Sequence, residues 1–352
     1  MSRKIHILLL PRFNMFSLTN VIEPTRIANY LSDHDIYTLN FISRETGPVT
    51  ASNGMSVLCE ALPDRLERRS LLLVVGSWGS ERFDDKRLFS WLRLQSRIGV
   101  QMCTVEQGTY MLAKSGLLRG KQATTHWSCI AGFQEQYPDI HVSEQLFTIE
   151  GNIMCCSGAT AGIDFMLKFI GDEHGTALAS EISNQMMHHP VRQGKEPQRK
   201  ALGRGLEKLG PDVRAAVEVI EKHISDPLVV PEIAKKVGLS QRQLERQFAK
   251  SVGCSIVQFG LLLRLQHARV LLISTNLGVR EIATASGFNS LSHFAYSFKK
   301  CFGRRPSTYR QAWPDQDETP HWPGTLGRFI ETLKPSRMAK EASKGLDDGR
   351  AG

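Results

Sequence analysis

One short stretch of the chain carries apolar and hydrogen-bonding side chains at helical spacing. Leu244 and Phe248 lie four residues apart, so a helix would place both on one buried face. The opposite face then carries hydrogen-bonding side chains: Gln241, Arg242, Glu245 and Arg246. In a major groove, Arg can read guanine and Gln can read adenine through paired hydrogen bonds. The pattern therefore predicts a DNA recognition helix.

The same pattern occurs twice, which favours a functional motif over an ordinary helical hairpin. Six residues of the first copy recur with an offset of 49 residues before Ser240 and 50 from Ser240 onward. They are Ala234, Gly238, Ser240, Leu244, Phe248 and Gly253, and their counterparts are Ala283, Gly287, Ser290, Phe294, Phe298 and Gly303. Each copy predicts a helix, a turn and a second helix. Gly238 supplies the positive φ that ends one helix, and Ser240 with Gln243 forms a capping box for the next.

The second copy presents a different outward face, made of Ser292, His293, Tyr296 and Lys299. These side chains are shorter and less charged, so we expect them to contact fewer bases. Between the copies, residues 256–273 place Leu262, Leu265, Ala268 and Leu272 in helical register. Such a helix is about 27 Å long, enough to hold two recognition helices roughly one turn of DNA apart. One chain could therefore occupy two successive major grooves.

Positive charge is concentrated on this part of the chain. Between Pro211 and Trp313 there are 15 Lys and Arg against 7 Asp and Glu, a surplus of +8 out of +9 for the whole chain. A charged surface alone is usually only a solvated face. Its coincidence with the repeat predicts contact with the phosphate backbone.

About a hundred residues of this region resemble the AraC/XylS family of transcription regulators. The resemblance rests on four motifs, at residues 239–248, 264–269, 287–290 and 302–306. It implies double-stranded DNA and RNA polymerase as partners. Arg304 and Arg305 follow the second recognition helix and are expected to contact phosphate more than base. One departure is Ile256, where the family usually has Pro, so the linking helix could begin differently.

The length of the chain indicates two domains, and its Cys and His pattern indicates no bound metal. A chain of 352 residues with 41% hydrophobic content is long for one core. Its seven cysteines lack CxxC spacing, which favours reduced thiols and a cytoplasmic location. Adjacent His188 and His189 would point apart on a helix, so we predict no metal site and no cofactor. The apolar run at residues 5–10 is too short for a signal peptide, and no stretch is predicted to span a membrane.

The first 175 residues alternate between strand and helix signals. Short apolar runs predict strands at residues 4–10, 36–43, 71–75 and 98–105, and helices are predicted at 16–32 and 86–96. Cys155 and Cys156 are also expected to lie in a buried strand. This order is typical of an α/β domain with a largely parallel, flavodoxin-like sheet. Ligands in such folds bind beyond the carboxyl ends of strands, which directs attention to the loops at residues 13–16, 76–79 and 106–108.

About 170 residues of this half resemble the class I glutamine amidotransferase-like superfamily, in its PfpI-like branch. The resemblance rests on residues 105–113, 116–118, 123–127 and 157–164. Together the two halves are similar to the GlxA type of AraC/XylS regulator. Enzymes of the superfamily place a Cys nucleophile on the turn after a strand, with a His nearby. Here Glu106 stands at the nucleophile position, and His126 is retained.

The Glu in place of Cys argues against catalysis. A carboxylate cannot do the work of the thiolate, and Cys103 lies three residues earlier, inside the predicted strand. Three interpretations remain: Glu106 acts chemically, it is only a polar turn residue, or the chain retains a pocket that binds a small molecule. We favour the pocket, with Glu106 and His126 at its polar end.

Aromatic residues near the same loops make the ligand hypothesis more specific. An anionic Glu106 beside the rings of Phe16, Trp78 and Trp127 could hold a cationic ligand. The resemblance implies metabolites such as a quaternary amine or an amino acid, although aromatic residues at loop ends more often serve packing alone. The predicted ligand-binding residues are Phe16, Gly76, Trp78, Glu106, Gln107, His126 and Trp127.

Four segments follow from these patterns. Residues 1–189 are the amidotransferase-like sensor and dimerisation domain, 190–210 a linker, 211–313 the DNA-binding domain, and 314–352 a polar, disordered tail. We expect a homodimeric transcription activator controlled by a small-molecule effector, with no enzymatic activity. Two rivals are an active amidase or hydrolase fused to a DNA-binding module, and a DNA-binding protein whose first domain senses nothing.

Overall fold

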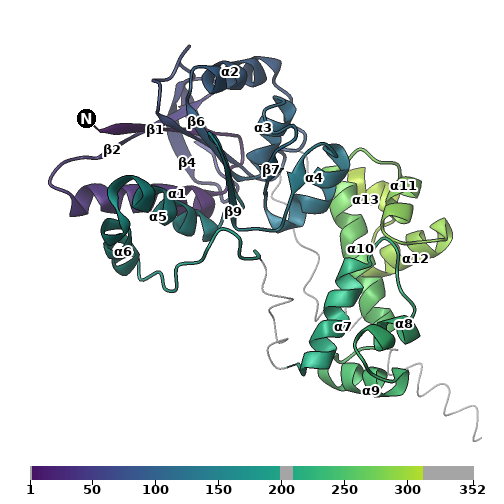
Figure 1. Ribbon diagram of the computed structural model, residues 1–352. Helices are drawn as coiled ribbons and strands as arrows, with labels where there is room; N and C mark the ends of the chain where they lie inside the picture. The colour runs from purple at the N-terminus through teal and green to yellow at the C-terminus, as the bar shows by residue number, and fades with distance from the viewer. Residues whose placement is uncertain (1, 199–208, 312–352) are drawn as a thin grey trace, which may run out of the picture. The chain divides into compact units, whose positions relative to one another are not determined.

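The chain folds into two compact units. The computed structural model describes residues 2–198 and 209–311, and the units divide between Lys200 and Ala201 (Figure 1). We call them the N-terminal unit and the C-terminal unit and describe each by itself. The predicted tail at residues 314–352 and the centre of the predicted linker lie outside the described residues.

An eight-stranded sheet forms the centre of the N-terminal unit, in the order β3-β4-β2-β1-β5-β6-β10-β9. Its strands are β1 (Arg3–Leu9), β2 (Tyr37–Ser43), β3 (Gly47–Thr50), β4 (Ser56–Ala61), β5 (Leu71–Gly76), β6 (Gln101–Glu106), β9 (Phe147–Glu150) and β10 (Ile153–Cys156). The six inner strands of this order, β4, β2, β1, β5, β6 and β10, pair in parallel with one another. The two edge strands, β3 and β9, pair antiparallel with their neighbours. The predicted α/β fold with a largely parallel sheet is confirmed.

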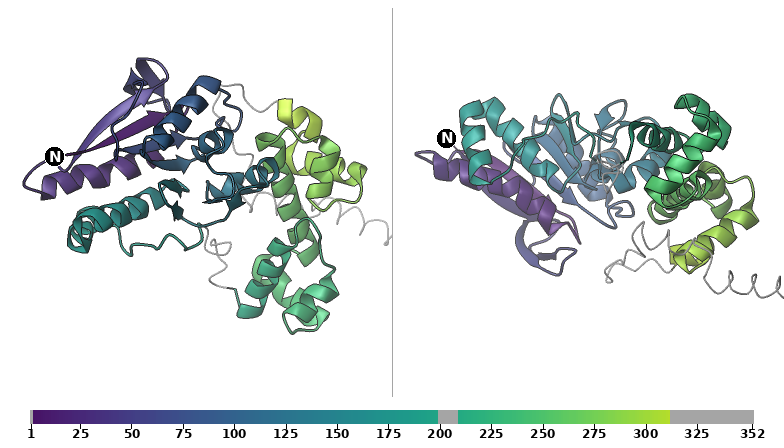
Figure 2. Two further views of the ribbon diagram at one scale, coloured as in Figure 1. Left: turned by 45° about the horizontal axis from the view of Figure 1, so that its top comes forward. Right: turned by 90° about the horizontal axis from the view of Figure 1, so that it is seen from below.

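Helices cover both faces of this sheet (Figures 1 and 2). On one face lie α1 (Met15–Leu31), α5 (Ala161–His174) and α6 (Thr176–Gln185), and on the other α2 (Lys86–Arg97) and α3 (Thr109–Lys114). Along β1 the side chains alternate between the two cores, because Ile5, Ile7 and Leu9 join one cluster and Leu8 joins the other. A strand buried on both faces needs the unbroken apolar run that this one has.

Some element boundaries differ from those predicted. The strand expected from residue 98 begins at Gln101, because Ile98 caps α2 and Gly99 turns the chain with a φ of +89°. His188 and His189, which were considered above as residues of a helix, lie after α6, because this helix ends at Gln185. Strands β3, β4 and β9 were not predicted, and neither were four short elements: β7 (Gln122–Ala123), β8 (His141–Val142), the 3-10 turn η1 (Trp127–Cys129) and α4 (Ile130–Gln136). The four short elements carry too few residues to show a hydrophobic period.

The C-terminal unit is helical and contains the two predicted helix-turn-helix motifs. The first is α8 (Val230–Lys236) with α9 (Gln241–Val252), and the second is α11 (Val279–Ala285) with α12 (Leu291–Phe302). The long α10 (Ile256–Ser274) joins them, and Figure 1 shows one motif near each of its ends. The remaining helices are α7 (Pro211–Lys222) and α13 (Pro306–Gln311).

Helix α10 is the core of this unit. Ser255 and Gln258 form its capping box, so the helix begins at Ile256 although that position lacks Pro. Within the described residues it is the helix long and apolar enough to span a membrane by composition. One set of its apolar side chains is nevertheless buried in the unit, including Phe259, Leu262 and Leu265. The apolar character of α10 is therefore explained by the core of the unit.

The turns of the two motifs are not packed alike. Gly238 and Gly287 hold equivalent places, with φ of +74° and +72°. A Cβ at Gly238 would meet open space, whereas one at Gly287 would lie 2.4 Å from the carbonyl oxygen of Ile224. Arg264 of α10 also donates from Nη1 to the carbonyl of Gly287 at 3.0 Å and lies over the ring of Phe288. The second turn is thus fixed on both sides.

These two glycines give a matched stability test. Gly238→Ala should cost about 1–2 kcal/mol for its left-handed backbone. Gly287→Ala should cost about 1–3 kcal/mol more, because its methyl group meets backbone that cannot move aside. Urea unfolding of the full chain, monitored by hydrogen exchange of core amides in α10, measures the loss of stability in both variants. Equal losses in the two variants would contradict the packing described for Gly287.

Candidate functional site

Glu106 lies at a sharp turn between β6 and α3. Its φ is +58°, a left-handed conformation that is uncommon for a residue other than Gly. The turn is close-packed from below, because a Cβ at Gly108 would lie 2.0 Å from the carbonyl oxygen of Val74. A strained strand-to-helix turn of this kind presents its central side chain beyond the end of the sheet. The predicted elbow is therefore present, with a carboxylate on it.

The Glu106 carboxylate is buried and accepts hydrogen bonds from two serines. Ser17 Oγ donates to Oε2 at 2.8 Å, and Ser77 Oγ donates to Oε1 at 3.0 Å. The residue is only 5% exposed. Burial raises the pKa of Glu106 to about 7, against the hydrogen bonds from Ser17, Ser77 and Asn14, which favour the charged form. Glu106 can therefore change its charge near neutral pH.

Two further loops close around the same residue. Thr125 Oγ1 donates to the carbonyl oxygen of Glu106 at 2.9 Å. On the other side, a Cβ at Gly158 would lie 2.8 Å from the Cβ of Glu106, and the Ala159 amide donates to Ser17 Oγ. The loops after β1, β5, β6 and β10 thus meet at one edge of the sheet, as the parallel topology predicts.

The predicted aromatic residues are close in sequence to the residues that contact Glu106. Phe16 precedes Ser17, Trp78 follows Ser77, and Trp127 lies two residues after Thr125. Their side chains are 54%, 40% and 36% exposed. His126 is half-buried, its Nδ1 lies 2.7 Å from Ser128 Oγ, and its ring is tilted 5.4 Å from that of Trp127.

The other two predicted ligand residues have structural roles that the sequence did not indicate. Gln107 is buried, and its amide nitrogen can donate to Glu81 Oε2 at 3.1 Å and to the Ser77 carbonyl at 2.9 Å. At Gly76, a Cβ would lie 2.6 Å from Ser80 Oγ and 2.8 Å from the Gly108 amide. Both residues hold the loop after β5 against the Glu106 turn.

Three residues of the site were not predicted: Ser17, Ser77 and Thr125. Ser77 falls within the loop at residues 76–79, to which the parallel-sheet rule directed attention. Thr125 lies within a segment quoted for the amidotransferase-like resemblance. No sequence signal distinguished Ser17, because its contact with Glu106 joins residues 89 positions apart.

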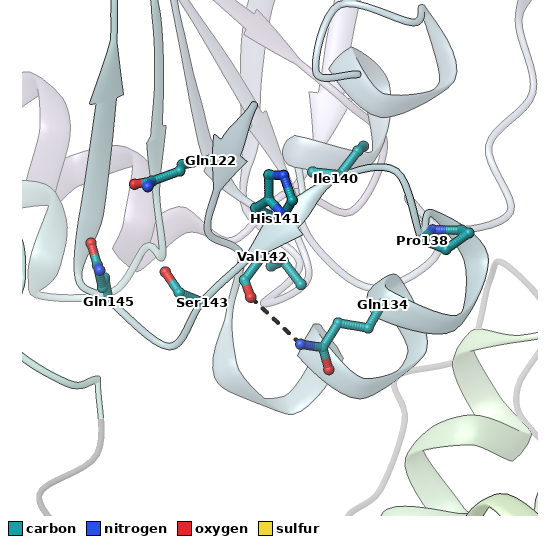
Figure 3. A pocket seen from close by; sticks show the side chains of 8 residues that line it. All are labelled: Gln122, Gln134, Pro138, Ile140, His141, Val142, Ser143 and Gln145. Atoms are coloured by element: carbon teal, nitrogen blue, oxygen red, sulfur yellow. Dashed lines mark hydrogen bonds between the residues drawn. The ribbon is translucent and has the colours of Figure 1, made fainter. Parts of the chain in front are cut away.

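A shallow pocket lies in another part of the N-terminal unit (Figure 3). Its volume is about 480 Å³, and its lining residues come from α4, β8 and the adjoining segments, including Gln134, His141 and Gln145. None of the predicted ligand-binding residues lines it. Its lining carries neither a carboxylate nor an aromatic ring other than His141, so it lacks the chemistry of the Glu106 site.

The cysteine thiols are unsuited to the missing nucleophile role. Burial raises the pKa of Cys103 well above its usual range, and its side chain lies inside the sheet. Cys155 and Cys156 are buried in β10, as predicted. Across residues 2–198 and 209–311 no group of three His, Cys, Asp or Glu side chains could hold a metal ion.

In the C-terminal unit, all ten predicted DNA-contacting side chains are exposed. On α9 the face carries Gln241, Arg242, Glu245 and Arg246, and Gln241 Nε2 donates to Glu245 Oε1 at 2.9 Å. Leu244 and Phe248 of the same helix are fully buried. On α12 and the turn after it the exposed residues are Ser292, His293, Tyr296, Lys299, Arg304 and Arg305.

Comparison with known proteins identifies both units. Residues 4–172 match the DJ-1/PfpI family model and residues 233–312 match a helix-turn-helix domain model. The HTH-type transcriptional regulator CdhR of Pseudomonas aeruginosa is 37% identical over 317 residues, covering 89% of this chain and 93% of that protein. The chain belongs to the AraC/XylS family of transcription regulators. It has the GlxA type of domain arrangement.

Two further regulators match along most of this AraC/XylS family member. GbdR of Pseudomonas aeruginosa is 35% identical over 312 residues, covering 89% of this chain and 85% of the relative. GlxA of Rhizobium meliloti is 31% identical over 313 residues, covering 88% of this chain and 96% of the relative. All three relatives are named as transcriptional regulators rather than enzymes.

The titration of Glu106 makes the stability of this regulator pH-dependent. Because the folded carboxyl holds its proton more tightly than the usual pKa of 4.5 implies, Glu106 stabilises the fold most at low pH. That contribution is lost as pH rises from about 4.5 to about 7, and amounts to about 3 kcal/mol. Relative to wild type, Glu106→Gln should therefore gain stability as pH rises across this range.

Chemical unfolding of both proteins between pH 5 and 8 measures the difference. Subtracting the two curves removes the titration of all other groups that the proteins share. A difference that stays constant with pH would contradict the raised pKa of Glu106.

Proposed function

We propose that this protein is a cytoplasmic transcription activator whose N-terminal unit binds a small cationic metabolite. The ligand class is a quaternary amine or an amino acid with a cationic group. The C-terminal unit binds double-stranded DNA, and the N-terminal unit also pairs two chains into a homodimer. RNA polymerase is the expected further partner. The N-terminal unit carries out no catalysis in this proposal.

The observation that supports the ligand proposal is that three exposed aromatic residues neighbour, along the chain, the three residues that hydrogen-bond to one buried carboxyl residue. Phe16, Trp78 and Trp127 each lie one or two residues from a side chain that donates to Glu106. The three aromatic residues come from three separate loops. A cation would gain from the ring faces and from the ionised carboxylate together.

The chemistry of the site favours binding over catalysis. Both Glu106 oxygens accept hydrogen bonds from serine hydroxyls, which hold the carboxylate in place and lower its nucleophilicity. The thiol of Cys103 is buried within the sheet. An amidase or hydrolase remains the rival, and it requires turnover that depends on Glu106 or His126.

The DNA part of the proposal rests on two exposed, differently charged recognition helices fixed to one long helix. Helix α10 spans 19 residues, about 28 Å at 1.5 Å per residue, which suits two successive major grooves. The α9 face offers two Arg side chains and the α12 face offers one Lys with Tyr and His. We therefore assign most base readout to α9.

A cationic probe tests the ligand site. A panel of amino acids, betaines, carnitine-like amines and polyamines is screened against the full-length protein by thermal shift, and each hit is titrated by calorimetry. Binding should weaken about tenfold for each pH unit below about 7, because protonated Glu106 no longer attracts a cation. Glu106→Gln, Trp78→Ala and Trp127→Ala should each weaken binding, by about tenfold or more for the two ring deletions at a desolvated site.

Tyr30→Ala is the matched control for these variants, because Tyr30 is also an exposed aromatic residue of the N-terminal unit but carries no predicted role. It should leave the affinity unchanged. If Glu106→Gln, Trp78→Ala and Trp127→Ala all bind the hit as wild type does, the proposed site is wrong. Turnover of a panel compound that disappears in Glu106→Gln would instead support the hydrolase.

Arginine substitutions test the DNA assignment. Arg242→Ala or Arg246→Ala should cost about 1–3 kcal/mol at one base position and relax specificity there. Arg304→Ala should weaken all sequences alike and reduce the salt slope by about 1. Binding to a site selected from random duplexes, and to unselected duplex, is measured by fluorescence anisotropy at several salt concentrations.

Arg214→Ala provides the control, because Arg214 is exposed on α7 outside both motifs. Equal losses on selected and unselected DNA for Arg242, Arg246 and Arg304 would refute the distinction between base and phosphate contacts.

A further inference from the structure

The last described residues of the N-terminal unit, 188–198, form a strap along its surface. The strap follows α6, and the chain continues from it through residues 199–208 into the C-terminal unit. Arg192 and Gln198 of the strap hydrogen-bond to the two loops that flank Glu106. The segment predicted as the start of a linker is therefore also in contact with the candidate ligand site.

At its first end the strap is held by a buried carboxylate. Asp164 of α5 is fully buried and accepts from the Arg192 amide at 2.8 Å and from Arg192 Nε at 3.0 Å. His188 Nε2 lies 2.8 Å from the same carboxylate. Removing one partner of such a pair leaves a buried charge, so this anchor is expected to persist.

Arg192 also contacts the loop that packs on Glu106. Its Nη2 donates to Thr160 Oγ1 at 2.8 Å. Thr160 ends the turn that contains Gly158 and Ala159, and this turn touches Glu106 and Ser17. The first anchor of the strap thus lies one residue from a loop that surrounds the carboxylate.

The second anchor is Gln198, the last described residue before the connection. Its Nε2 donates to the Thr125 carbonyl at 2.8 Å and to Thr124 Oγ1 at 3.0 Å, and its Oε1 accepts from the Trp127 amide at 2.7 Å. Thr125 in turn donates to the Glu106 carbonyl. Gln198 therefore holds the loop that carries His126 and Trp127, and it is two hydrogen bonds away from Glu106.

Between its anchors the strap lies against β9. The Leu146 amide donates to the Gly194 carbonyl at 3.0 Å, and a Cβ at Gly194 would lie 2.6 Å from the ring of Phe147. Gln145 and Pro197 form an antiparallel bridge. These contacts are backbone bonds at a sheet edge, a type of contact that can be released locally without unfolding the core.

We propose that residues 188–198 couple the occupancy of the Glu106 site to the chain that leads into the C-terminal unit, with Gln198 as the positioning residue. This inference rests on the proposed ligand function. A ligand that moves Trp127 must change the three bonds of Gln198 to residues 124–127, and hence the hold on residue 198. Because coupling is reciprocal, releasing Gln198 must also loosen the loop at residues 124–127.

Gln198→Ala in the full-length protein tests the coupling from the strap side. Gln193→Ala is the matched control, because Gln193 lies in the same strap with an exposed side chain. Amide exchange at Trp127 and tryptic cleavage after the exposed Lys195 should each become about tenfold faster in Gln198→Ala, since its four side-chain hydrogen bonds are lost, three of them to residues 124–127. Neither rate should change in Gln193→Ala.

The site side is tested with choline as the probe, or with the tightest-binding compound of the panel. Bound choline should change the rate of cleavage after Lys195 in wild type and in Gln193→Ala. In Gln198→Ala, choline should still bind but no longer change that rate, which a purely structural role for Gln198 does not predict.

The outcomes separate this inference from the proposed function. A probe that binds while cleavage at Lys195 stays the same overturns the coupling and leaves the ligand class standing. If no panel compound binds, the proposed ligand class is wrong. The exchange rates of Gln198→Ala alone then show whether Gln198 holds the loop at residues 124–127. Wild-type exchange at Trp127 in Gln198→Ala overturns the coupling in either case.

Discussion

A carboxylate buried at a left-handed backbone position is the constraint on which the N-terminal unit depends. Glu106 loses its hydration there, and the hydroxyls of Ser17 and Ser77 replace it from two separate loops. The backbone conformation is held by close contacts that only Gly108 and Gly158 allow. The sheet must therefore bring four strand ends to one point, and the loops that supply hydrogen bonds also carry the exposed rings. The hydrogen bonds that this one buried carboxylate requires therefore determine how the loops of the site are arranged.

The two helix-turn-helix motifs show how a repeat diverges once its copies are packed. The first retains a complete capping box, Ser240 with Gln243, whereas the second has His293 in the place of the Gln and keeps only the Ser290 bond. The second turn is instead fixed by tertiary contacts, from Arg264 and from the backbone near Ile224. This difference lets the outward face of α12 vary without loss of the local fold. It fits a division in which α9 reads bases and α12 contributes fewer specific contacts.

Elements with a local hydrophobic period or helix cap could be predicted from the sequence. Elements and contacts that depend on distant residues could not. The strands β1, β2 and β5, the helices α1, α2 and α10, and both motifs have apolar spacing or caps that depend on residues within a few positions of one another. The edge strands β3 and β9 and the short β7 and β8 are set by pairing with distant segments. At the site, the elbow residue and the aromatic loop residues were found, since strand ends in a parallel sheet share one edge. Ser17 and Gln198 were not, because their partners lie 89 and 73 residues away along the chain.

The central claim is that one site in the N-terminal unit controls DNA binding by the C-terminal unit. The most direct test is the affinity of the full-length protein for a selected duplex, measured with and without a panel compound that binds. The account predicts that the compound changes the dissociation constant for DNA by about fivefold or more, and that DNA changes the dissociation constant for the compound by the same factor. A ligand and a duplex that each bind with unchanged affinity in the presence of the other would contradict it.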